Sequence, residues 1–147
     1  MGLEALRLHS HEEFQTWLAQ EVEVRDELEA LLGVELGLDE HSLDTLEAAL
    51  LRRYRTPDEA LTLGERGVLD AAARHVGLVM ILSIDGAEWD INLDDPDDVY
   101  YRLPVIRFSD RSSDCPLTAV TAALDRRTGS FLRELVEANE ELYNSPD

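Results

Sequence analysis

The stretch from Val68 to Phe108 constrains the fold most, because it holds the only sustained apolar block of the chain. The alanine-rich segment VLDAAARHVG leads into this block, LVMILSI, and AEWDINL then alternates apolar and polar residues. Helical spacing in the first segment and a period of two residues in the last are typical of an amphipathic helix and a half-buried strand. We therefore predict that the rest of the chain packs on a helix and a small sheet formed here.

Two structures fit the residues that join these patterns. Asp85-Gly86 between apolar runs is a strong signal for a two-residue hairpin, which would place Ile84 opposite Ala87. The alternative continues the helix to about Ile84 and begins the strand at Ala87. We favour the helix, because VLDAAARHVG offers no stop signal other than Gly77.

The alternation of residues 88–93 predicts a strand whose inward face carries Trp89, Ile91 and Leu93. Residues 100–108 predict a second strand, antiparallel to the first, with residues 94–99 as the connection. Pro104 lacks a backbone N–H, so we expect this second strand to lie at a sheet edge or to contain a bulge.

Helix signals surround this region. Ser10 and Glu13 form a capping box that predicts a helix as far as Gly33, with a bend at residues 24–26. A second helix is predicted with Ser42 as its cap, a third after Thr56 with Pro57 at its first position, and a fourth from Glu65. A fifth is predicted to start at Pro116, capped by Asp114 or Cys115, and a last one follows residues 128–130.

The fold class that follows is α+β. We expect a single acidic domain over residues 1–147, mainly helical, with a small antiparallel sheet of two or three strands around residues 79–108. A hydrophobic content of 44% is ordinary for a globular protein and too high for a disordered chain.

The net charge of −19 is the strongest compositional feature, and every basic residue is an arginine. Such a charge repels phosphate backbones and anionic membrane surfaces, so direct binding to nucleic acid or to a membrane is not expected. Basic proteins and cations remain as candidate partners. Mimicry of DNA by rows of carboxylates remains as a candidate function. Acidity that serves solubility alone is the alternative interpretation.

A cytoplasmic location is expected from the cysteine count and the N-terminus. The single cysteine allows no internal disulfide, which favours a reducing compartment. The start MGLEALRLHS lacks the basic and long apolar regions of a signal peptide, and no run is long enough for a membrane span.

Carboxylates concentrate between residues 85 and 98, where the chain carries Asp85, Glu88, Asp90, Asp94, Asp95, Asp97 and Asp98. The spacing does not match an EF-hand loop. A solvated turn, a protein-binding surface and a site for magnesium or calcium are the alternatives. Zinc is disfavoured, because no histidine or cysteine is close in sequence.

Other chemistry has weaker signals. The histidines His9, His11, His41 and His75 lack the spacing of zinc proteases, and His75 is expected to be a hydrogen-bonded core residue. Cys115 stands at a predicted helix start, but no local motif supplies a base for it. Phosphate-binding glycine loops and nucleophile elbows are absent from the sequence. We therefore predict no catalytic residue, no metal ligand and no cofactor.

Two segments suggest a family. HSLDTLEAALLRRY resembles the SLxxLExxLLxRY helix of uncharacterised small actinobacterial proteins. LDAAARHVGLVMILSIDGAEWDINL resembles their helix-to-strand segment at Gly77, Gly86 and Trp89, although Leu78 replaces the usual acidic residue. YRLPVIRF resembles their LPV strand. The resemblance implies a helix before Asp85 and a bacterial origin; it carries no activity and no functional residue to this chain.

The function predicted from these observations is a non-enzymatic cytosolic interaction module, immunity-like or regulator-like, that binds a more basic protein. The partner-binding residues are predicted to be four aspartates that attract the partner and two tyrosines that anchor it: Asp94, Asp95, Asp97, Asp98, Tyr100 and Tyr101. The alternatives are a hydrolase that depends on a divalent cation or on paired carboxylates, and an acidic DNA mimic.

Overall fold

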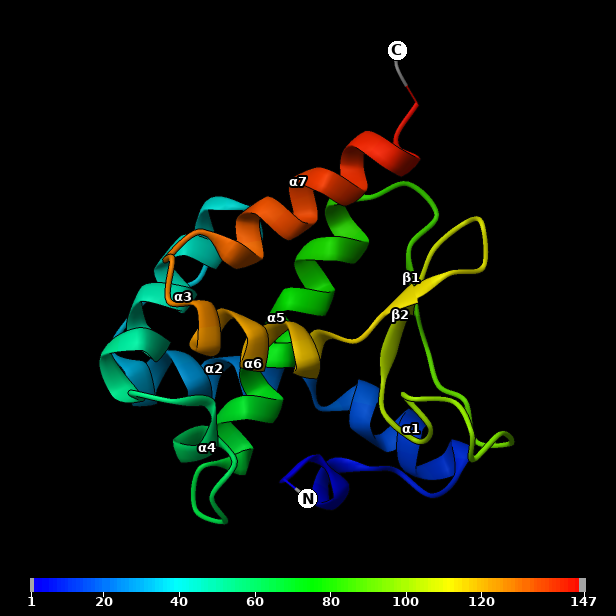
Figure 1. Cartoon of the computed structure of the whole chain (residues 1–147), viewed down its shortest axis with the longest axis horizontal. Helices are drawn as coiled ribbons and strands as arrows, with labels where there is room; N and C mark the ends of the chain where they lie inside the picture. The colour runs from blue at the N-terminus through cyan, green and yellow to red at the C-terminus, as the bar shows by residue number, and fades with distance from the viewer. Residues whose placement is uncertain (1, 146–147) are drawn as a thin grey trace.

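Helix α5 (Arg66–Ser83) forms the centre of the computed structural model, which describes residues 2–145 (Figure 1). Eleven of its residues are buried, from Val68 to Met80. Three of them are the consecutive alanines 71–73, whose small side chains let neighbouring helices approach closely. Helices α2, α4, α6 and α7 and strands β1 and β2 all contact α5.

The elements follow in the order η1 (Gly2–Leu6), α1 (His11–Ala19), α2 (Glu21–Leu32), α3 (His41–Arg53), α4 (Pro57–Ala60), α5, β1 (Glu88–Asp90), β2 (Val105–Arg107), β3 (Ser113–Asp114), α6 (Pro116–Arg126) and α7 (Phe131–Tyr143). This is the mainly helical α+β domain that the sequence predicts. Helix α5 continues to Ser83 and Ile84 is its C-cap, so the helix alternative is confirmed and the hairpin is wrong.

The sheet is antiparallel, with the strand order β1-β2-β3. Trp89 pairs with Ile106 across the first ladder, and Ile106 pairs with Asp114 across the second. Two expectations are corrected. Pro104 does not lie on an edge strand, because it directly precedes β2, which is the central strand. The third strand forms at residues 113–114, beyond the range of residues 79–108 predicted for the sheet.

Two helix boundaries also differ from the prediction. The first helical segment breaks at Gln20 rather than bending at residues 24–26. Ser42 is not the cap of α3: the side chain of Asp39 accepts the Ser42 amide at 3.1 Å, and the Ser42 hydroxyl donates to the Asp39 carbonyl. The N-cap contact of α1 is confirmed, since the Glu13 amide donates to Ser10 Oγ at 3.1 Å.

Trp89 fixes the sheet against α5. Its indole lies directly on Gly77, where an added Cβ would stand 2.2 Å from two ring carbons. Trp17 from α1 meets the same indole edge-to-face, with the ring centroids 4.9 Å apart. The missing side chain at Gly77 therefore creates the space that lets strand β1 and helix α1 reach the central helix.

A closed set of polar contacts holds Trp17 in place. Its Nε1–H donates to Asp70 at 2.9 Å, and the other Asp70 oxygen pairs with Arg74 at 2.8 Å. The Arg74 guanidinium stacks over the Trp17 ring at 4.1 Å and also donates to the Trp17 carbonyl. The buried guanidinium of Arg74 therefore has partners, as a charge in the low-dielectric interior requires.

Substitution of Gly77 tests this arrangement. We expect Gly77→Ala to lower the free energy of unfolding by about 1–3 kcal/mol, because the new methyl group overlaps the Trp89 indole. Gly67→Ala, also in α5, is the matched control: its Cβ meets no atom within 4 Å. The control is expected to be neutral or stabilising by up to about 1 kcal/mol. Chemical denaturation measures both, and equal stabilities would contradict the close contact.

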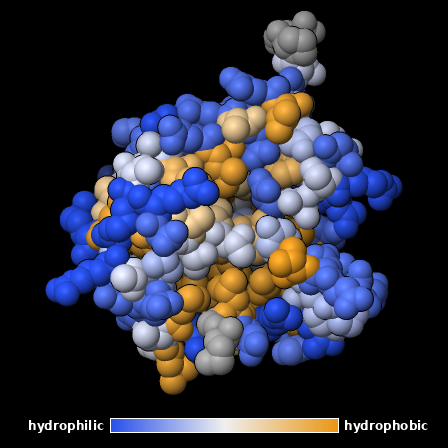
Figure 2. Space-filling model, in the orientation of Figure 1, coloured by the Kyte–Doolittle hydropathy of each residue, from blue (hydrophilic) through white to orange (hydrophobic). Residues whose placement is uncertain are grey.

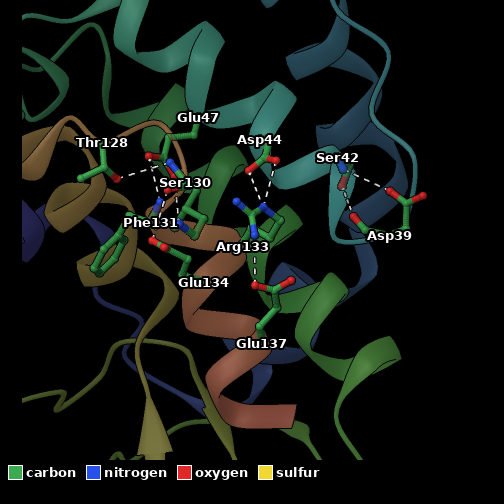
Figure 3. A network of polar contacts seen from close by, with 11 residues as sticks. Asp39, Ser42, Asp44, Glu47, Thr128, Ser130, Phe131, Arg133, Glu134 and Glu137 are labelled. Carbon is green, nitrogen blue, oxygen red and sulfur yellow. Dashed lines mark hydrogen bonds and ion pairs between the residues drawn. The ribbon is translucent and has the colours of Figure 1, made fainter. Parts of the chain in front are cut away.

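The start of α7 is anchored to α3 by a buried carboxylate (Figure 3). Glu47, 1% exposed, accepts the amides of Phe131 at 3.2 Å and Leu132 at 2.9 Å. A carboxylate at this position satisfies free N–H groups of the first helical turn and interacts favourably with the helix dipole. Beside it, Arg133 joins Asp44 of α3 to Glu137 of α7.

Arg127 provides a second contact between the α6–α7 turn and α3. Its guanidinium donates to the carbonyls of Leu51, Tyr54 and Arg55, at the C-terminal end of that helix. Arg127 itself has φ 57°, the left-handed conformation that ends α6. The turn between α6 and α7 is therefore attached to α3 at both of its ends.

Removal of the Glu47 carboxylate tests this anchor. We expect Glu47→Ala to lower the free energy of unfolding by about 1–3 kcal/mol, because it leaves backbone amides at the start of α7 without an acceptor. Glu47→Gln keeps an acceptor oxygen and is expected to lose less. Thermal melts compare the two, and a larger loss for glutamine than for alanine would contradict the capping role.

Most of the surface in Figure 2 is hydrophilic, with an apolar tract toward the turn that follows α4. Leu63 lies in that turn and is 83% exposed. Within residues 2–145 no helix is long and apolar enough to span a membrane.

Candidate partner-binding surface

Residues 91–104 form the loop that joins β1 to β2, and we call this segment the acidic loop. Its two ends are fixed by apolar contacts: Ile91 packs with Phe14 and Trp17, and Leu103 belongs to the main core. The Arg102 amide donates to the Asn92 carbonyl at 2.8 Å and closes the base. The sequence predicts strands at residues 88–93 and 100–108, whereas the ladder pairs only Glu88–Asp90 with Val105–Arg107.

Three side chains organise the interior of the acidic loop. Asn92 Oδ1 accepts the amides of Asp94 at 3.0 Å and Asp95 at 3.1 Å, and Asn92 Nδ2 donates to Asp98 at 2.8 Å. Asp95 accepts the Asp97 amide at 3.0 Å. Asp98 accepts the Tyr100 amide at 2.9 Å. These turns, typical of Asn and Asp, give the loop a defined shape.

The four predicted aspartates therefore differ in role. Asp94, Asp95 and Asp97 are exposed, whereas Asp98 is half-buried and both of its carboxylate oxygens accept hydrogen bonds. The carboxylates of Asp94 and Asp97 make no hydrogen bond or ion pair with the described residues. They are the loop charges that are most available to a partner.

The two predicted tyrosines are half-buried, and their rings contact different parts of the protein. Tyr100 packs partly against the main core. Tyr101 lies beneath the guanidinium of Arg102, which is 4.9 Å from its ring centroid. Between the acidic turns and these rings stands Val99, 76% exposed. Val99 was not predicted from the sequence, because a single apolar residue among polar ones carries no periodic signal.

Beside the loop lies a hollow of about 280 Å³. Its lining unites three of the predicted residues, Asp94, Asp98 and Tyr100, with Asp90, Ile91, Asn92, Val105, Arg107, Arg111 and Ser113. Asp95, Asp97 and Tyr101 do not line it. Three carboxylates and two guanidinium groups thus meet at one concave surface.

Arg107 and Arg111 were not predicted for this surface. Arg107 pairs with Asp90 across β1 and β2, and its register opposite Glu88 follows only once the strand pairing is known. Arg111 lies in the turn after β2 with φ 74°, a conformation that its sequence does not signal. The two arginines give the hollow a lining of mixed charge, together with Asp90, Asp94 and Asp98.

Metal binding gains no support from the geometry. Across residues 2–145 no group of three or more His, Cys, Asp and Glu side chains is arranged to hold a metal ion. In the acidic loop, Asp95 and Asp98 each use carboxylate oxygens on backbone amides.

His75 is a buried core residue, as the sequence predicts. Its Nε2 lies 2.8 Å from the hydroxyl of Ser42, and both residues are at most 3% exposed. Because the Ser42 hydroxyl donates its proton to Asp39, it accepts from His75 Nε2–H. Burial, helped by the positive charge of Arg25, lowers the His75 pKa to about 4. A substrate has no access to this serine–histidine pair.

Cys115 is likewise enclosed. It is 2% exposed at the start of α6, and burial raises the pKa of its thiol. A raised pKa keeps the thiol protonated, so it is a poor nucleophile.

The low pKa of His75 makes stability depend on pH. The folded state keeps His75 neutral to about pH 4, whereas an unfolded chain binds the proton near the ordinary pKa of 6.5. The contribution of neutral His75 to the free energy of unfolding is therefore complete above pH 6.5. It is lost, by about 1.4 kcal/mol per pH unit, as the pH falls toward 4.

Denaturation curves of wild type and His75→Gln between pH 4.5 and 8 check this. The stability advantage of the wild type is expected to shrink below pH 6.5. Comparing the two proteins removes the shared titration of the carboxylates. Parallel profiles would contradict a neutral His75 in the fold.

Comparisons with known proteins give no relative from which to infer a role. The chain matches no family model, no curated protein and no solved structure.

Proposed function

We propose that this protein is a non-enzymatic interaction module of the cytoplasm, which binds a more basic protein through the acidic loop. The observation that carries the proposal is the shape of that loop. Its own Asn92, Asp95 and Asp98 side chains hold the backbone, and the carboxylates of Asp94 and Asp97 make no hydrogen bond or ion pair with the described residues.

A fixed loop is favourable for binding. A loop that already has its bound conformation loses little conformational entropy on association. The carboxylates of Asp94, Asp95 and Asp97 project into solvent, where they attract a basic surface before contact. Such attraction raises the association rate and makes it dependent on salt.

Contact itself is assigned to Val99 and Tyr100. Val99 is the most exposed apolar side chain of the loop, and Tyr100 lines the hollow with Asp94 and Asp98. A basic side chain of the partner would lie near these carboxylates and the tyrosine ring. An immunity-like or regulator-like role, in which the module occupies a basic functional surface of another protein, fits this arrangement. The resemblance to small actinobacterial proteins remains a prediction.

The triple variant Asp94→Asn, Asp95→Asn, Asp97→Asn tests the proposal. The side-chain amide that replaces the Asp95 carboxylate retains an acceptor oxygen for the turn, so the fold is expected to persist. Immobilised wild type and variant are used to capture proteins from a lysate of the source cells, and recovery is quantified by mass spectrometry. A specific partner is expected to associate about tenfold more slowly with the variant at low salt, and this difference should shrink at high salt.

The control removes the same charge elsewhere. Glu35→Gln, Asp125→Asn, Glu141→Gln neutralises three exposed carboxylates on other parts of the chain. This control is expected to retain the partner at nearly the wild-type rate. Equal losses in the two triple variants would show that net charge alone matters. Failure to recover any protein whose capture depends on the acidic loop would refute the proposal.

A further inference from the structure

A second surface lies on the other side of the molecule from the acidic loop, where α2 passes the start of α5 (Figure 1). A groove of about 230 Å³ opens between them, and we call it the α2 groove. Its lining is mostly apolar and consists of Val24, Glu27, Leu28, Leu31, Gly64, Gly67, Val68 and Ala71.

The α2 groove exists because two of its lining residues are glycines. A Cβ at Gly64 or at Gly67 would meet no atom within 4 Å, so both positions face open space. Neither glycine has a positive φ, which means that its backbone conformation does not require glycine. The missing side chains leave room for atoms from another molecule.

Large apolar side chains stand beside this opening. Leu31, which lines the groove, is 51% exposed. Leu63, next to Gly64 in the chain, is 83% exposed and is the most exposed large apolar side chain among the described residues. Exposed apolar groups around a groove are typical of a surface that another protein covers.

The charges along α2 indicate the kind of partner. Glu23, Asp26 and Glu27 are all exposed and make no ion pair with the described residues. The nearest arginine of the same helix, Arg25, pairs instead with Glu21. Glu23 and Glu27 are four residues apart on the helix, a spacing at which like charges repel. A basic partner would relieve that repulsion, whereas a second copy of this chain would add to it.

We propose that the α2 groove binds an amphipathic helix of a partner protein, with one or two large apolar side chains in the groove and Lys or Arg residues facing α2. The groove is smaller than the roughly 300–1000 Å³ typical of sites for drug-sized molecules, so side chains are the better occupants. Helix-in-groove binding uses such anchors at intervals of three and four residues. The inference concerns a surface separate from the acidic loop and does not rest on the function proposed above.

The test uses a designed probe because the partner is unidentified. The probe is a fluorescein-labelled helical peptide of about 17 residues, roughly four to five turns long, with leucines in one stripe and lysines elsewhere. One control peptide has the same composition in an order that destroys the stripe, and another has glutamates in place of the lysines. Fluorescence anisotropy measures the affinity of each peptide for the intact protein.

Three groove variants and one loop variant locate the binding. Gly67→Leu fills the groove and Leu31→Gln removes an exposed apolar wall. Gly67→Ala serves as a mild filling variant, which α5 is expected to tolerate. Thermal melts confirm that each variant is folded. The triple asparagine variant of the acidic loop serves as the control for charge alone.

The striped lysine peptide is expected to bind at least tenfold tighter than the scrambled peptide, and the glutamate peptide is expected not to bind. Gly67→Leu should weaken binding about tenfold and Gly67→Ala or Leu31→Gln severalfold, while the loop variant leaves the affinity largely unchanged.

Other outcomes overturn the inference. Equal binding of striped and scrambled peptides would indicate charge attraction without a groove. A loss of affinity only in the loop variant would place the peptide on the acidic loop. Self-association in sedimentation velocity that Gly67→Leu abolishes would make a second copy the occupant.

Discussion

The contact between the Trp89 indole and Gly77 is the constraint on which the other parts of this structure depend. It determines how closely β1 approaches α5, and through Trp17 it determines where α1 lies. The acidic loop follows β1 directly, and its first residues pack on α1. A position in the middle of a helix, left without a side chain, thus sets the location of a surface loop that does not touch it.

Patterns of burial could be predicted from the sequence, whereas the hydrogen-bond partners of polar side chains could not. The length of α5 and the inward direction of Trp89 and Ile91 follow from periodicity. The early end of β1 at Asp90 could not be predicted, because the alternation of apolar and polar residues continues to Leu93. At the start of α3 the side-chain acceptor is Asp39 rather than Ser42, although both residue types are acceptable there. Tertiary contacts decide between such equivalent local solutions.

The candidate surface shows the same division. Composition directs attention to the aspartates between residues 94 and 98, but their unequal roles require the hydrogen bonds. Arg107 and Arg111 reach the hollow only through strand pairing and a left-handed turn. The groove beside α2 could not be predicted from the sequence, because its opening comes from glycines in a helix start and the turn before it. Absent side chains leave no hydrophobic pattern.

The pairing of Trp17 with Trp89 also determines what spectroscopy observes in this protein. The chain has two tryptophans, and both belong to the same contact between α1, β1 and α5. Indole emission therefore reports the loss of this contact and is insensitive to separation of α3, α6 and α7. If α1 and the sheet detach before the helices separate, fluorescence and circular dichroism will give different midpoints for unfolding.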